Sequence, residues 1–294
     1  MKKTDCTVSL YRILGNDLPP RHKRGQHYDN AAFMLDHEGP LPHCRRHWIV
    51  NRIVDPKMER KIIRLLEARR EPYLRIPFDL EEYAKSKGNR IPARIIAMNY
   101  VDRFLDTPAK REEWNRINYV TNINPARNLA LREGRKNADW VIPIDAGCCF
   151  TPEGWRQIVE KLAAQRRRDK VFCVPTYRLS DNGEYFTFDR DRDRFTETEP
   201  MLIFGKETRM RFNEHLRYGM LVKIELIERL GFAKRRTHAG YVITDPRVKA
   251  GYNVRLSSGA RGDSVTLKHR GRARGKGISL LIGKLDERCH ARCR

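Results

Sequence analysis

The sequence lacks the features that mark several large classes of protein. No apolar run approaches the roughly 18 residues that a membrane-spanning helix needs. There is no G-x-G-x-x-G or Walker A loop, no Ser-His-Asp or Cys-His nucleophile spacing and no zinc motif. The 7 cysteines are an odd number without the spacing of a disulfide framework. These absences argue against a membrane-spanning protein, a disulfide scaffold and the common phosphate-binding loops.

The N-terminus also lacks a recognisable export signal. Met1-Lys2-Lys3 is followed by no apolar segment. We therefore expect a cytoplasmic protein, either free or in peripheral contact with the inner membrane surface. With 294 residues, 40% of them hydrophobic and including 11 Phe and 11 Tyr, the chain is expected to be folded, as one large domain or two small ones.

Positive charge is what the sequence has in excess. Its 60 Lys and Arg against 37 Asp and Glu give a formal net charge of +23. Such an excess favours anionic partners, which include nucleotide phosphates, acidic glycans, lipid phosphates and nucleic acid. In the stretch Arg261–Lys276, basic residues alternate with glycines. We predict that this stretch is a loop, in a basic C-terminal arm (261–294), that holds an anionic group near the active-site mouth. A nonspecific nucleic-acid contact is the competing interpretation.

The N-terminal part has the order of an α/β protein. Thr7–Leu14, His47–Val54 and Tyr73–Phe78 have strand-like patterns, and helical patterns at Ala31–Leu35 and Met58–Leu66 separate them. Strands that alternate with helices imply parallel pairing with right-handed crossovers. We therefore predict a Rossmann-type, mostly parallel sheet flanked by helices.

Later segments continue this pattern after a charged, mostly helical insertion at 80–119. The predicted division is a donor-binding half (1–175) and an acceptor-side half (176–260), followed by the basic arm. The later predicted elements are strands at Val171–Pro175, Pro200–Gly205 and Gly251–Leu256 and a helix at Leu221–Leu230 that stops at Gly231.

The most informative segment is 122–151. Asn124 is predicted to cap a helix whose first residue is Pro125, where the missing N–H costs nothing. The apolar run Trp140–Ile144 fits a strand covered on both faces. Asp145 then falls at the carboxyl end of that strand, where ligands bind in open α/β sheets. This placement makes an enzyme the leading hypothesis.

These residues carry a family resemblance. Ala126-Arg127-Asn128 on a helix, followed by a strand that ends in Asp145 and by Phe150-Thr151-Pro152, resembles the donor-binding core of GT-A glycosyltransferases, particularly family 2. In that family the strand ends in a D-x-D motif that holds a divalent cation and the sugar-nucleotide diphosphate. Here the motif is Asp145-Ala146-Gly147, so the second carboxylate is missing.

The resemblance implies site residues. It makes Asp145 a catalytic residue and the ligand of Mn²⁺ or Mg²⁺, with a metal dependence weaker than that of a full D-x-D site. It places Arg127 beside the nucleotide, whereas Asn128 orients a loop by hydrogen bonds. The competing roles are a strand-end cap for Asp145 and a surface ion pair for Arg127.

Other site residues are expected around the nucleotide and the acceptor. Tyr11, Arg12, Asn16 and Asp17, toward the end of the first strand, are predicted to face the nucleobase and ribose. By the resemblance, Asp79 after the third strand stands where related enzymes hold the base or ribose. Glu214 is the candidate catalytic base, with an ion pair to Arg211 or Arg217 as its alternative role. Asp245 and Asp263 are weaker candidates for the base.

Three functions follow from these observations. The first is a glycosyltransferase, of the hexosyl- or hexosaminyltransferase type, that moves a sugar from a nucleoside-diphosphate sugar to a glycan or a lipid-linked glycan. The second is another nucleotide-using transferase, such as a nucleotidyltransferase, although Gly15–Pro20 is poor in the Gly and Lys that its loop would need. The third is a nucleic-acid-binding protein, which leaves Asp145 without a role.

Overall fold

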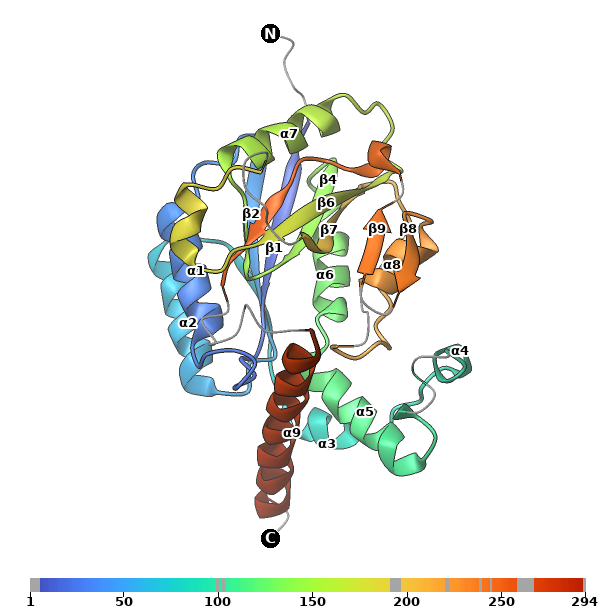
Figure 1. Cartoon of the computed structure of the whole chain (residues 1–294). Coiled ribbons are helices and arrows are strands. Elements are labelled where there is room, and N and C mark those ends of the chain that lie inside the picture. Colours follow the sequence, from blue (N-terminus) through green and yellow to red (C-terminus); the bar gives the residue numbers. More distant parts are fainter. Residues whose placement is uncertain are drawn as a thin grey trace.

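The computed structural model describes residues 6–98, 101, 104–190, 197–219, 223–237, 240–243, 245–257 and 267–292. These residues form a mixed α/β structure around one 8-stranded sheet in the order β3-β2-β1-β4-β7-β6-β10-β5 (Figure 1). Its strands are β1 (Val8–Leu14), β2 (Cys44–Asn51), β3 (Tyr73–Ile76), β4 (Trp140–Asp145), β5 (Cys148–Cys149), β6 (Val171–Arg178), β7 (Glu197–Gly205) and β10 (Asn253–Arg255). A separate hairpin pairs β8 (Ala233–Thr237) with β9 (Gly240–Ile243).

The sheet is mostly parallel, as predicted. β1 pairs in parallel with β2 and with β4, β2 with β3, and β6 with β10. β7 and β5 run antiparallel to their neighbours. The chain passes outward from β1 to β3 and returns to the other side of β1 with β4. The carboxyl ends of β1 and β4 therefore form a topological switch point, where open α/β sheets bind their ligands.

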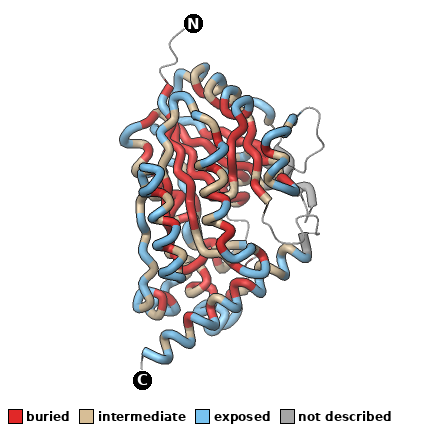
Figure 2. Tube along the Cα trace, turned by 90° about the vertical axis from the view of Figure 1, so that its left-hand side faces the viewer, coloured by how far each residue is buried: buried red, intermediate tan, exposed pale blue. Residues whose placement is uncertain are grey.

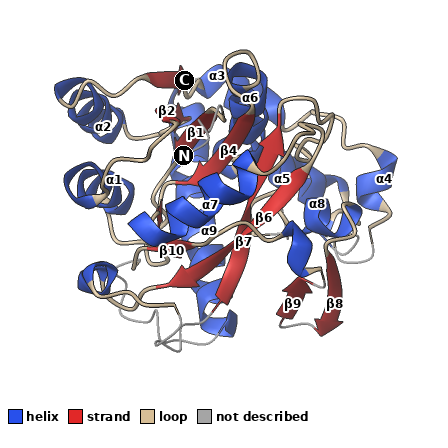
Figure 3. Cartoon of the chain, turned by 90° about the horizontal axis from the view of Figure 1, so that it is seen from above, coloured by secondary structure: helices blue, strands red, loops and turns tan. Residues whose placement is uncertain are grey.

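Side chains along a strand point alternately to the two faces of the sheet. Both faces of this sheet carry apolar side chains, and helices cover both. Tyr11 and Ile13 pack with α6 (Asn124–Gly134) and α8 (Ile224–Arg229). The opposite face packs against α1 (Gln26–His37), α2 (Pro56–Ala68) and α7 (Pro152–Ala163). α1 and α2 lie on one side of the sheet and α8 on the other (Figure 3). Two short 3₁₀ helices, Asn182–Phe186 and Pro246–Val248, lie in later connections. The strands between these layers are largely buried (Figure 2).

A second group of helices lies beyond the carboxyl ends of the strands. It contains α3 (Leu80–Ser86), α4 (Ala93–Ile96) and α5 (Pro108–Thr121), which form the predicted helical insertion, together with α9 (Leu267–Arg292) (Figure 1). Asp286 of α9 accepts a hydrogen bond from the hydroxyl of Tyr83 (2.8 Å) and pairs with Arg116 (2.6 Å). Although α9 has 26 residues, neither it nor any other helix in the described ranges is apolar enough over a sufficient length to cross a membrane.

The prediction that Arg261–Lys276 is a loop is wrong from Leu267 onward, where α9 begins; residues 261–266 lie outside the described ranges. Packing overrides the low helix propensity of glycine here. Ile278, Ile282 and Leu285 are buried against the insertion. Gly277 approaches the backbone so closely that a Cβ atom would lie 2.6 Å from the carbonyl oxygen of Leu18.

The predicted start of α6 also needs a correction. The helix begins at Asn124 rather than at Pro125, and the side chain of Asn124 does not cap it. Instead, Asn122 Oδ1 accepts a hydrogen bond from the Asn124 N–H (2.9 Å). Thr151 caps α7, since its Oγ1 accepts a hydrogen bond from the Gly154 N–H (3.1 Å).

Candidate functional site

Asp145 ends β4 at the switch point and is surrounded by three cations. Its Oδ1 lies 2.6 Å from Arg127 Nη2, and its Oδ2 lies 3.4 Å from Arg255 Nη1 and 3.6 Å from Lys223 Nζ. α6 contributes Arg127, β10 contributes Arg255, and Lys223 immediately precedes α8. Elements distant in the sequence thus converge on one carboxylate. We call Asp145, Arg127, Lys223 and Arg255 the cation cluster.

The cation cluster is buried and positive. The side chains of Arg127 and Lys223 are 1% and 2% exposed, while Arg255 is 24% exposed. Burial alone would raise the pKa of Asp145, but Lys223, Arg127 and Arg255 outweigh it and hold that pKa far below its ordinary value. Lys223 also lies 3.6 Å from Glu199, whose side chain is partly exposed. Even with Glu199 counted, the three cations exceed the two carboxylates.

The donor set at Asp145 does not fit a divalent metal ion. Both carboxylate oxygens already face cations, which would repel a further positive charge. The next residue is Ala146, which is buried, and Gly147 follows, so the strand end supplies no second carboxylate. We therefore assign no metal-dependent step to Asp145.

The segment Phe212–Glu214 lies against α6. The backbone N–H of Phe212 donates to Asn128 Oδ1 (2.9 Å), and Asn128 Nδ2 donates to the carbonyl of Phe212 (2.9 Å) and to Glu214 Oε1 (2.7 Å). Asn122 and Asn124 bind the backbone carbonyls of Glu214 and Asn213, at 2.6 and 2.7 Å. Asn128 thus orients a loop, as expected.

Arg127 connects this segment to Asp145. Its guanidinium carbon lies 5.0 Å from the centre of the Phe212 ring, and its Nη1 donates to Asn124 Oδ1 (2.9 Å). Four predicted site residues therefore lie in one connected network: Asp145, Arg127, Asn128 and Glu214. Glu214 is exposed, and its carboxylate accepts a hydrogen bond from Asn128.

Tyr11 and Arg12 do not face an open site, contrary to expectation. Tyr11 is buried and stacks on His47, with ring centres 4.7 Å apart. Arg12 is 1% exposed and pairs with the fully buried Glu38 at 2.6 Å. Both residues are in the middle of β1 rather than at its carboxyl end, so their side chains enter the two packed layers. We read them as core residues.

Asn16 and Asp79 take structural positions. Asn16 Nδ2 donates to the carbonyls of Arg52 (2.7 Å) and Val120 (3.3 Å), and its Oδ1 accepts from the Val54 N–H (2.8 Å). It thereby joins the connections after β1, β2 and α5. Asp79 is exposed and caps α3, and the two backbone hydrogen bonds of this cap lower its pKa.

The two weaker candidates for the base remain apart from the network as far as the structure describes them. Asp245 caps a 3₁₀ helix and pairs with the exposed Arg247 at 3.0 Å. Asp263 lies outside the described residues.

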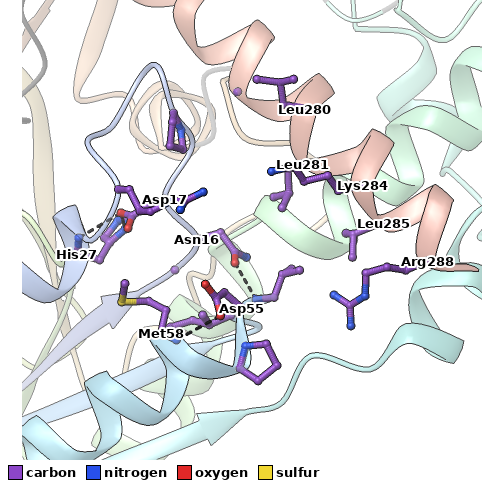
Figure 4. A pocket seen from close by; sticks show the side chains of 17 residues that line it. Asn16, Asp17, His27, Asp55, Met58, Leu280, Leu281, Lys284, Leu285 and Arg288 are labelled. Carbon is purple, nitrogen blue, oxygen red and sulfur yellow. Dashed lines mark hydrogen bonds and ion pairs between the residues drawn. The ribbon is translucent and has the colours of Figure 1, made fainter.

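A cavity of about 440 Å³ opens at the carboxyl ends of β1 and β2 (Figure 4). Asn16 and Asp17 line it after β1, and Asp55 lines it before α2. α9 forms the opposite wall, from which Lys284 and Arg288 lie across the cavity from Asp17 (Figure 4). Charged groups of both signs thus line the cavity. Apolar side chains also line it, both from the loops after β1 and β2 and from α9.

Beside this cavity, Asp17, His22 and His27 form a cluster in which one ligand atom from each lies within 4.8 Å of the others. His27 Nδ1 is 2.7 Å from Asp17 Oδ1. Burial, His27 and the cations Arg21, Arg255 and Arg274 hold the pKa of His22 well below its ordinary value, so His22 is neutral at pH 7.

Sequence reasoning missed Lys223, Arg255 and the two histidines. Arg255 had a faint signal, since it is the single cation of the predicted strand Gly251–Leu256, whereas Lys223 shares the predicted helix Leu221–Leu230 with Arg229 and had none. The histidines had a stronger one, because both follow Asp17 closely after the first strand. The sequence does not show how close these residues lie to Asp145 and Asp17 in space.

Comparisons with known proteins do not identify a family: no family model matches the chain, and no curated protein matches it.

Proposed function

We propose that this protein is a glycosyltransferase that moves a sugar from a nucleoside-diphosphate sugar to an acceptor hydroxyl on a glycan or a lipid-linked glycan. The observation that carries the proposal is the cation cluster at the switch point. It holds three cations around Asp145, at 2.6 to 3.6 Å. A site with this charge at this end of a sheet favours an anionic nucleotide.

The charge of the cluster suits the chemistry of the leaving group. When the sugar leaves, negative charge grows on the diphosphate, and fixed cations in a site that excludes water stabilise it. Arg127 and Lys223 are fixed by burial, and Arg255 is the member with the most exposed side chain. In this proposal the cations of the protein take over the phosphate neutralisation that the D-x-D metal supplies in the family that the chain resembles.

Glu214 is the proposed general base for the acceptor hydroxyl. Its carboxylate is exposed, and Asn128 binds Oε1 at 2.7 Å, which fixes the side chain and leaves Oε2 for a proton. Because α6 carries both Asn128 and Arg127, one helix would position the base and a cation of the diphosphate site.

Calorimetric titration with a panel of nucleoside diphosphates and their sugar conjugates, in chelator, tests the proposal. Arg255→Ala should weaken nucleoside-diphosphate binding roughly tenfold or more, since a hydrogen bond to a charged group contributes about 1.5–3 kcal/mol. Arg247→Ala is the matched control, because Arg247 also pairs with an aspartate but is 88% exposed. Absence of binding by every nucleotide in a folded sample would refute the proposal.

Product analysis separates this proposal from a nucleotidyltransferase. Glycosyl transfer releases a nucleoside diphosphate, whereas nucleotidyl transfer to a sugar phosphate releases pyrophosphate. Chromatography of the nucleotide products, with each class of substrate supplied, shows which bond breaks.

A nucleic-acid-binding protein is the second candidate, and α9 favours it. Arg272, Lys276, Lys284 and Arg288 are exposed along this helix. If these residues bind phosphate backbones, replacing all four by Ala should weaken RNA or DNA binding and lower its salt dependence. Retained nucleoside-diphosphate binding in that variant would instead favour the transferase, with α9 as a contact for an acidic or lipid-phosphate acceptor or for the membrane surface.

A further inference from the structure

The loop between β1 and α1 brings three metal-ligating side chains together. Asp17, His22 and His27 each offer an atom within 4.8 Å of the other two, and all three are partly buried. Ten residues of sequence separate the first from the last, so the loop must fold back on itself to achieve this.

Backbone hydrogen bonds hold the loop in this shape. Asp17 Oδ2 accepts from the Gly25 N–H (2.7 Å), and Asp17 Oδ1 accepts from the His27 N–H (3.1 Å). Gly25 has φ = 84°, a left-handed conformation that glycine adopts without strain. The Leu18 N–H donates to His22 Nδ1 (3.2 Å), which fixes this ring as well. Asp17 and His27 are thus positioned before any ligand binds, whereas His22 must give up the hydrogen bond from Leu18 to offer a nitrogen lone pair to an ion.

We propose that Asp17, His22 and His27 bind a divalent transition-metal ion of the kind represented by Zn²⁺, Co²⁺ and Mn²⁺. Two imidazoles and one carboxylate suit such ions, whereas Mg²⁺ and Ca²⁺ prefer all-oxygen sites. On binding, the ion takes over the position that the proton occupies between His27 Nδ1 and Asp17 Oδ1, and a ring nitrogen of His22 completes the set. Three protein ligands leave further coordination positions open, as in catalytic rather than structural zinc sites.

The open positions would be directed at an anionic ligand. Asp17 and His27 line the cavity in front of α9 (Figure 4). The charged groups that act on His22 are Arg21, Arg255 and Arg274, and Arg255 also belongs to the cation cluster. These cations disfavour a bare metal ion, and an anion bound among them would remove that penalty. The ion should therefore bind more tightly when pyrophosphate is present. This coupling between metal and anion rests on the proposed function.

Cobalt provides a direct probe of the site. The full chain, freed of metal by chelator and dialysis, should bind one Co²⁺ per chain and show the visible absorption of a nitrogen-ligated ion. Equilibrium dialysis with Zn²⁺ should give the same stoichiometry. His22→Ala and His27→Ala should each weaken binding at least about tenfold, which is the lower end of what losing even an outer-shell partner costs. His37→Ala is the matched control, because His37 is exposed at the other end of α1.

The outcomes distinguish this proposal from the proposed function. Circular dichroism first establishes that each variant is folded; Asp17→Asn serves as an additional variant that keeps the shape of the side chain. If the wild-type chain binds no Co²⁺ or Zn²⁺, or if His22→Ala and His27→Ala bind as the wild type does, the metal proposal is overturned and Asp17–His27 is a hydrogen-bonded pair only. Nucleoside-diphosphate binding in chelator does not depend on this result. Added inorganic pyrophosphate that leaves metal affinity unchanged would overturn the coupling between the two sites.

Discussion

Asp145 and Asp17 lie at the carboxyl ends of neighbouring parallel strands, yet their surroundings differ in sign. Three cations surround Asp145, whereas Asp17 binds the backbone N–H groups of Gly25 and His27 and the imidazole of His27. The first carboxylate partly neutralises a positive site. The second organises a loop that brings two imidazoles beside it. One edge of the sheet thus places a group of cations next to a loop that carries a carboxylate and two imidazoles.

This difference shows that the residue type alone does not decide what an aspartate at a strand end does. β4 ends where α6, β10 and the residue just before α8 meet, and each of these supplies a cation to Asp145. β1 ends in a loop that turns back on Asp17. The elements that converge on the strand end therefore set the ligand, and the predictions below test the two ends against each other.

The largest effect on stability is expected at Asp145. Asp145→Asn removes the counter-charge of Arg127 and Lys223, which are almost fully buried. Removing one partner of a buried ion pair typically costs about 3–5 kcal/mol, and the free energy of unfolding in urea should fall by that order. Asp36→Asn, which breaks an exposed pair with Arg69, is the control and should change stability little. Equal losses in the two variants would mean that the cation cluster is not energetically special.

The next effect is on turnover, and it tests whether the general base lies near Asp145 or near Asp17. In glycosyl-transfer assays Glu214→Gln should lower kcat by about 10²-fold or more, which is the low end for a general base, while donor affinity stays near the wild-type value. His27→Gln should retain most of kcat, because in our proposals His27 binds a metal rather than a proton of the acceptor. The reverse pattern would move the base to the Asp17 side, where the Asp17–His27 hydrogen bond already orients the imidazole.

Much of the fold followed from local patterns. Apolar runs and helical spacing predicted β1, β2, β4 and the helices between them, because burial on both faces imposes these patterns on the sequence. Asp145 was placed at its strand end for the same reason. The network joins Asp145, Arg127 and Asn128, which the family resemblance selected, to Glu214, which was selected as the candidate base. Whether they bind a nucleotide stays a prediction.

The errors arose where tertiary contacts outweigh local preference. Tyr11 and Arg12 were assigned to a site because they belong to the first strand, but both are buried, Tyr11 stacked on His47 and Arg12 paired with Glu38. Arg261–Lys276 was predicted to be a loop because glycines alternate with basic residues there, but from Leu267 onward these residues belong to α9, which packs through Ile278, Ile282 and Leu285. Lys223 and Arg255 were missed because their meeting with Asp145 depends on how β10 and α8 dock on the sheet, which no local pattern encodes.

A smaller effect is expected where α9 touches the loop of Asp17. Gly277→Ala places a Cβ atom 2.6 Å from the Leu18 carbonyl oxygen, so it should lower the free energy of unfolding by about 1–3 kcal/mol, as overpacking does. Gly283→Ala in the same helix meets nothing within 4 Å and should stabilise it by about 0.5–1 kcal/mol. Metal binding should suffer in the first variant more than nucleoside-diphosphate binding. An equal loss of both would show that the two strand ends respond as one unit.

The smallest effect is the acid dependence of stability. The pKa of Asp145 is lowered in the folded chain, because Lys223, Arg127 and Arg255 together outweigh the effect of burial, from an ordinary value of 3.8. Below that value the unfolded chain takes up a proton that folded Asp145 does not, so Asp145 contributes stability that is present above about pH 4 and is lost as the pH falls. Urea unfolding between pH 5 and 3 should therefore show a smaller decrease in stability for Asp145→Asn than for the wild type. Parallel slopes for the wild type and Asp145→Asn would contradict the electrostatic account of the cation cluster, even if Asp145→Asn proves as unstable as expected.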